Sequence, residues 1–196
     1  MINDTFLQKE VLSIDRFLHS LVRIKLPVPK VCISDKINDA EEYHKGVITL
    51  NPGYLKGKER INISALMAHG YFHHVQHTKF KFYDPSRLWD MLKVYNLKHD
   101  EIQEIVDNIF ESSAMFFAAA YLTRNEMGNR KVARIVRYLH SKPYTPLAGK
   151  FIHGNDMIIL LYSNSGNSIR KTMQHFLTYK GQAKTVKDFL EARHLS

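Results

Sequence analysis

Four of the eleven histidines lie within nine residues, at positions 69, 73, 74 and 77. His69 and His73 are four residues apart, so a helix would place both imidazoles on one face, about one turn from each other. Two imidazoles at that spacing can share one tetrahedral metal ion, and zinc takes nitrogen ligands at about 2.0–2.1 Å. The spacing therefore indicates a metal site, although it also fits a helix with exposed histidines that binds metal only incidentally.

The stretch 65–77 resembles the active-site helix of zincin metallopeptidases, whose signature is His-Glu-x-x-His. Small and apolar residues precede His69, and aromatic residues fill the space before His73, as in those enzymes. Gly70 stands where the signature has its glutamate. The likeness therefore includes the histidine pair but not the acidic residue between them.

A second likeness lies 38 residues after His73, in the run Glu111-Ser112-Ser113-Ala114. This run resembles the Glu-x-x-Ala motif of the gluzincin branch, and its continuation to Leu122 resembles gluzincins of the ImmA/IrrE type, whose phage and plasmid members cleave repressors. Residues 43–52 resemble the strand that precedes the active-site helix in that family. The resemblance covers residues 28–122.

The resemblance implies a zinc-dependent peptidase acting on a protein or peptide, with Zn²⁺ held by His69, His73 and Glu111 and a water in the fourth position. Glu104 and His77 are the other candidates for the third ligand. Tyr121 could hydrogen-bond an oxyanion, although core packing is the commoner role of such a tyrosine. The family's strand runs along the cleft and pairs with extended substrate; the corresponding residues here are Val47, Ile48, Thr49 and Leu50.

Gly70 is the main departure from the zincin pattern, because the glutamate at this position is the general base that takes a proton from the attacking water. Glycine also costs a helix interior about 0.5–1 kcal/mol relative to alanine. The chain is an inactivated copy of a glutamate-bearing enzyme, a natural pseudoenzyme that kept metal and groove, or an enzyme whose base comes from elsewhere. We expect little or no turnover from the chain as given. We also expect Gly70→Glu to gain peptidase activity without backbone rearrangement.

The basic charge is concentrated in the last third of the chain. Residues 128–196 contain 12 lysines and arginines but three acidic residues, and so carry the entire net charge of +9. Such asymmetry favours an anionic partner, although it also fits a solvated face. The alternative to a peptidase is therefore a non-catalytic, metal-bearing module that binds nucleic acid through Arg130, Arg134, Arg137, Arg170 and Lys171. Two helices separated by Gly181 would allow a helix-turn-helix-like arrangement.

Hydrophobic periodicity and turn signals predict an α+β protein with a short antiparallel or mixed sheet. We expect a gluzincin-like domain at 1–127 with an active-site helix and a glutamate-bearing helix, and a basic, mainly helical region at 128–196, which could pack on the same domain. The expected helices are 5–23, 63–77 with Asn62 or Ser64 as N-cap, 88–95, 100–122, 131–140, 167–179 and 183–193. The expected strands are 28–34 and 47–50, separated by a polar stretch at 35–45.

Composition limits the class of protein further. The chain has 196 residues, 44% of them hydrophobic, which is enough for a core without a disulfide or metal staple. The longest apolar run, 157–162, is far shorter than the roughly 20 residues that span a bilayer, and no secretory leader is visible. The single cysteine, Cys32, has no partner for an internal disulfide. We therefore expect a cytoplasmic protein with no membrane partner.

Overall fold

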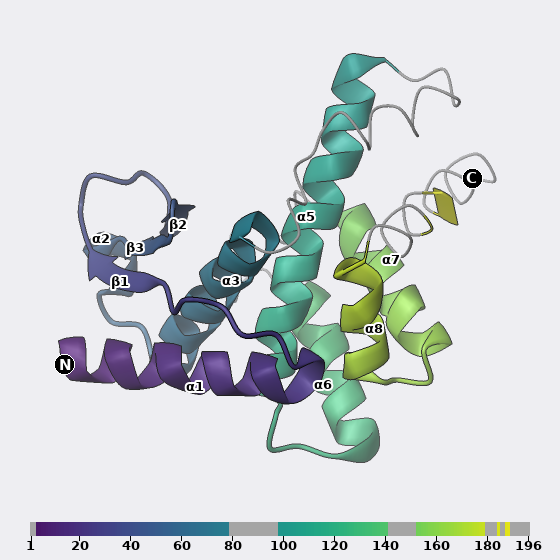
Figure 1. The fold of residues 1–196 in the computed structure, drawn as a ribbon, viewed down its shortest axis with the longest axis horizontal. Helices are drawn as coiled ribbons and strands as arrows, with labels where there is room; N and C mark the ends of the chain where they lie inside the picture. The colour runs from purple at the N-terminus through teal and green to yellow at the C-terminus, as the bar shows by residue number, and fades with distance from the viewer. Residues whose placement is uncertain (1–2, 79–97, 141–151, 179–183, 185–186, 189–196) are drawn as a thin grey trace.

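The computed structural model describes residues 3–78, 98–140, 152–178, 184 and 187–188, and these form seven helices and one small sheet (Figure 1). The α+β class expected from the sequence is confirmed. The helices are α1 (Asp4–Val22), α2 (Pro52–Leu55), α3 (Arg60–Thr78), α5 (His99–Leu122), α6 (Gly128–His140), α7 (Ile152–Asn164) and α8 (Ile169–Phe176). The strands are β1 (Lys30–Ile33), β2 (Glu41–His44) and β3 (Val47–Leu50).

The sheet is mixed, with the strand order β1-β3-β2. β1 runs parallel to β3, and β2 runs antiparallel to it. The central position of β3 corrects the expectation that Val47, Ile48, Thr49 and Leu50 border the cleft, because both edges of this strand are already paired. Among the described strands, β2 is the one that lies at the edge beside α3.

Strand β2 was not expected, because its sequence, Glu-Glu-Tyr-His, lies in a polar stretch. Its side chains nevertheless alternate as a strand requires: Glu41 and Tyr43 are partly buried, whereas Glu42 and His44 are exposed. Glu41 is tolerated on the inner face because it pairs with His69 of α3. Tertiary pairing therefore decides the structure of a segment whose hydropathy gives no strand signal.

Helices α3 and α5 form the centre of the molecule, and the sheet lies on the opposite side of α3 from α5 (Figure 1). Almost every residue of α3 from Ile63 to Gln76 is buried, because α1, β2, β3 and α5 all pack on it. A helix covered on all sides loses the one-sided apolar stripe that marks a surface helix. It begins at Arg60, so the N-cap expected at Asn62 or Ser64 is wrong.

The basic region packs against the rest of the chain. Helices α6 and α7 contact α5, and α8 contacts α1, α5 and α7. The buried cluster is continuous across residue 127, with Ile135, Ile158 and Met173 in the same cluster as Leu7 and Phe117. Helix α7, which the sequence did not predict, comes close to α5: a Cβ on Gly154 would lie 2.6 Å from the carbonyl oxygen of Asn108.

Some of the expected helices lie partly or wholly outside the residues that the structure describes. The helix expected at 88–95, and most of the one expected at 183–193, lie outside the described residues. Ser168 caps α8 by accepting a hydrogen bond from the backbone amide of Lys171. Within the described part of the chain, no helix has both the length and the apolar character needed to cross a bilayer.

Candidate metal centre

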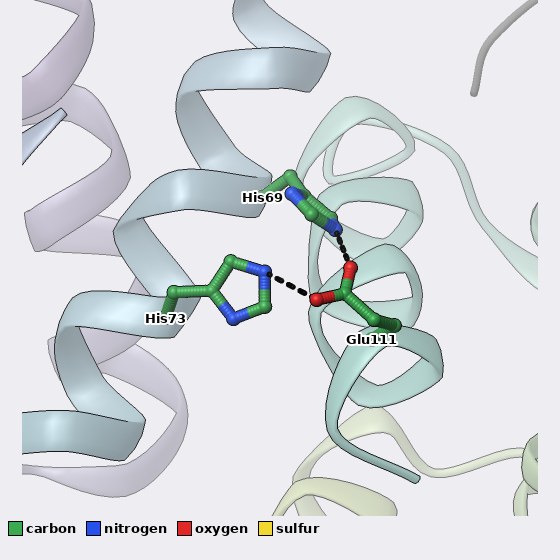
Figure 2. A group of neighbouring side chains, drawn as sticks. All are labelled: His69, His73 and Glu111. Carbon is green, nitrogen blue, oxygen red and sulfur yellow. Dashed lines mark ion pairs between the residues drawn. The ribbon is translucent and has the colours of Figure 1, made fainter. Parts of the chain in front are cut away.

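Three side chains from two helices converge on one point (Figure 2): His69 and His73 of α3 and Glu111 of α5. His69 Nε2 lies 3.3 Å from Glu111 Oε2, and His73 Nε2 lies 3.5 Å from Glu111 Oε1. Tetrahedral zinc with bonds of about 2.0–2.2 Å places neighbouring ligand atoms about 3.3–3.6 Å apart. The described residues thus offer two imidazoles and one carboxylate at a spacing that a zinc ion would fit.

The local sequence explains this convergence. On α3, His69 and His73 are one turn apart and face the same neighbour, with their rings perpendicular and 4.5 Å between centroids. The phenyl ring of Phe110 stacks on His73 with centroids 4.5 Å apart, and Phe110 directly precedes Glu111. The packing of α3 on α5 therefore delivers the carboxylate to the histidine pair.

Both imidazoles are also held at their second nitrogen. His69 Nδ1 is 2.8 Å from Glu41 Oε2, and His73 Nδ1 is 2.8 Å from Gln76 Oε1. The amide nitrogen of Gln76 donates to the carbonyl oxygen of Phe110, which fixes the amide oxygen toward His73. Because these carboxylate and amide oxygens accept hydrogen bonds, each Nδ1 carries a proton and each Nε2 faces the shared point. Metal-ligating histidines are usually oriented in this way.

The charges around His69 are strongly coupled. Burial alone would lower the pKa of His69, but the charge of Glu41 and hydrogen bonds to Glu111 and Glu41 outweigh burial and raise it to about 10. Burial alone would raise the pKa of Glu111, but its hydrogen bonds to His69 and His73 hold it well below its usual range. Without a metal, a proton on His69 therefore balances the carboxylates, and a metal ion would compete with that proton.

The three residues open into a cleft of about 270 Å³ between α3, α5 and the segment leading into β2. Asp39, Ala40 and Glu42 line the sheet side of this cleft, and Tyr138 of α6 lines it from the C-terminal region. The cleft gives the candidate metal centre access to a ligand from outside, as a catalytic site requires and a closed structural site does not.

Gly70 has little free space beside it. A Cβ at this position would lie 2.5 Å from Glu41 Oε1, and 3.0 Å from both Glu41 Cδ and Ile48 Cγ2. These near atoms all belong to side chains, so the expectation that Gly70→Glu needs no backbone rearrangement stays a prediction. Any side chain at position 70 has to displace the carboxyl group of Glu41.

The structure does not place the other candidate residues, Glu104, His77 and Tyr121, in the group formed by His69, His73 and Glu111. Glu104 is exposed and two turns from Glu111, about 10 Å along the axis of α5. His77 lines the cleft but does not belong to the cluster of ligand atoms. Tyr121 is buried and hydrogen-bonded to Glu10 and Ser13 of α1 at 2.9 Å, so its hydroxyl serves packing between α5 and α1, in place of the oxyanion role considered for it.

Sequence reasoning missed three residues of the site: Glu41, Gln76 and Tyr138. Gln76 follows His73 by three residues, a spacing at which helical side chains meet, so it could have been found. Glu41 and Tyr138 reach the site through strand pairing and packing of α6, and no local pattern marks them.

Comparison with protein-family models, curated proteins and solved structures finds no match to this chain. The inference about function therefore depends on the geometry of the site and on the motifs.

The coupling at His69 predicts how the stability of the metal-free protein depends on pH. The pKa of about 10 in the folded state lies above the ordinary 6.5, so the contribution of protonated His69 is complete below pH 6.5 and is lost as pH rises toward 10. Urea unfolding of chelator-treated protein should therefore show the unfolding free energy falling over that range. His69→Ala should flatten this part of the profile, and parallel profiles for the two proteins would contradict the coupling.

Proposed function

We propose that this chain is a zincin-like zinc protein built for peptide-bond hydrolysis, with little or no turnover as given because Gly70 replaces the general base. The observation that carries the proposal is the convergence of His69, His73 and Glu111, whose candidate ligand atoms lie within 4.8 Å of one another beside an open cleft. The resemblance of the two helices to gluzincin motifs points the same way. When bound there, zinc would polarise a substrate carbonyl and lower the pKa of water.

The chain's own residues suggest how a peptide would be held. Strand β2 is an edge of the sheet and lies beside the cleft, so its backbone could pair with an extended segment. In this proposal, Glu41–His44 pair with the extended substrate, the role that the sequence resemblance implied for residues 47–50. Leu66, Met115 and Tyr138 supply apolar surface for a side chain of the bound peptide.

The metal part of the proposal predicts about one zinc per chain. His69→Ala, His73→Ala and Glu111→Ala should each lose stoichiometric zinc in elemental analysis of gel-filtered protein, because each removes one ligand. His77→Ala is the matched control, since His77 lines the cleft outside the ligand cluster and its loss should leave the stoichiometry unchanged. Full retention of zinc by Glu111→Ala would refute the ligand set.

The catalytic part predicts that activity requires two changes. Gly70→Glu alone should stay inactive, because its side chain collides with Glu41. Gly70→Glu combined with Glu41→Ala should gain chelator-sensitive cleavage of unfolded protein substrates, with general-base catalysis contributing roughly 10²–10⁴-fold.

The control is the unchanged chain, loaded with zinc and assayed under the same conditions. Equal chelator-sensitive cleavage by the unchanged chain would mean that another group acts as the base. A double variant that is folded, binds zinc and cleaves nothing would leave a non-catalytic metal protein.

A second candidate function, nucleic-acid binding, is favoured by the surface of α6. Arg130, Arg134 and Arg137 are all exposed and lie at spacings that place them on one side of the helix. They border a hollow of about 390 Å³ next to α5. Arg170 contributes less to this proposal, because its guanidinium donates to the carbonyl oxygen of Ser20 at 3.0 Å.

Nucleic-acid binding through α6 predicts a salt-dependent affinity. Arg130→Ala and Arg137→Ala should each weaken binding of duplex DNA and reduce the slope of log affinity against log salt by about 1. Lys56→Ala, which removes an exposed lysine after α2, should change the slope less. Absence of detectable DNA binding at low salt would leave the arginines as a solvated face.

A further inference from the structure

Gly70 of α3 and Glu41 of β2 lie in close contact, and the absence of a side chain at position 70 makes this contact possible. Glu41 comes from the edge strand β2, yet its side chain is 5% exposed, and its carboxyl group lies against the backbone of α3 at Gly70. Oε1 occupies space that a side chain at position 70 would need, at 2.5 Å from the Cβ site. The glycine is therefore what allows this carboxylate to approach the helix.

The other oxygen of the same carboxylate contacts the metal centre indirectly. Glu41 Oε2 lies 2.8 Å from His69 Nδ1, on the side of the ring opposite Glu111. A carboxylate at this position fixes the tautomer and the ring orientation of a ligating histidine and increases its basicity as a ligand. Glu41 does not belong to the cluster of candidate ligand atoms, so it acts through His69.

We propose that Gly70 and Glu41 are a matched pair, in which the missing side chain on α3 makes room for a carboxylate from β2 that positions His69 for metal binding. The proposal depends on the metal centre of the proposed function, but not on peptidase activity. Gly70 then has a structural role of its own: a site that lost only its base would have no need of a buried glutamate over the glycine.

The contact between Gly70 and Glu41 predicts that a glycine-to-alanine substitution inside a helix lowers the melting temperature. Glycine to alanine inside a helix normally stabilises the helix, but Gly70→Ala should lower the melting temperature of chelator-treated protein, since the new Cβ displaces Glu41. In a Glu41→Ala background the same substitution should leave the melting temperature unchanged or raise it. Equal shifts in the two backgrounds would overturn the pairing.

Metal affinity tests the positioning role. Glu41→Ala should weaken zinc binding by about 10–100-fold in a competition titration with a chromophoric chelator. Glu41→Gln should recover part of this loss, because its amide oxygen still accepts from Nδ1–H of His69. Gly70→Ala should also weaken zinc binding, and adding it to Glu41→Ala should cause little further loss.

Glu42→Ala is the matched control, since Glu42 is the next residue of β2, is exposed, and lines the cleft without belonging to the cluster of candidate ligand atoms. Equal zinc affinity in Glu41→Ala and Glu42→Ala would refute the positioning role. The absorption spectrum of bound Co²⁺ gives a further readout: it should change in Glu41→Ala and Gly70→Ala but not in Glu42→Ala.

Failure of the pair and failure of the proposed function give different results. If the protein binds no zinc, the metal centre fails, but the melting temperatures of the metal-free variants still decide whether Gly70 and Glu41 are coupled. If zinc binds and the substitutions act independently, the pair fails and the metal centre stands. Should Gly70→Ala alone fail to fold, folding of the double variant with Glu41→Ala supports the pair, and misfolding of both refutes it.

Discussion

The organisation of the central helices depends on a buried cluster of charges, in which Glu41 and Glu111 contact opposite nitrogens of His69. Removing carboxylates from water costs several kcal/mol per ion unless a partner compensates. Here the compensation comes from the imidazole, which retains a proton because its pKa is raised to about 10. Strand β2, helix α3 and helix α5 must therefore keep their relative positions for the cluster to be tolerated.

The surrounding core supplies that rigidity. The aromatic rings of Phe72 and Phe117 stack at 5.1 Å between centroids, joining α3 to α5 near the histidines. Gln76 adds a polar connection, because it bridges His73 to the backbone of α5 through the carbonyl oxygen of Phe110. The candidate metal centre thus lies on two packed helices, where a small displacement is resisted by close packing.

The sequence predicted the elements that carry a signal in their own residues, namely helices α1, α3 and α5 and strands β1 and β3. The meeting of His69, His73 and Glu111 was expected from the resemblance to gluzincin motifs, and the structure brings these three side chains together. Strand β2 was missed because two of its four residues are glutamates, and helix α7 was missed because it begins in a stretch that contains proline and glycine. In both cases burial by neighbouring elements determined the structure, and a single sequence does not reveal those neighbours.

Gly70 shows how a motif and a structure lead to different readings of one residue. Compared with the zincin signature, the glycine is a missing glutamate. In the fold, a carboxylate occupies the space beside Gly70, and it is supplied by Glu41, which lies 29 residues earlier in the sequence. The space beside Gly70 is filled by this carboxylate, which is hydrogen-bonded to the candidate ligand His69. Gly70 and Glu41 therefore have to be considered together. The carboxylate of Glu41 limits which side chains can be accommodated at position 70.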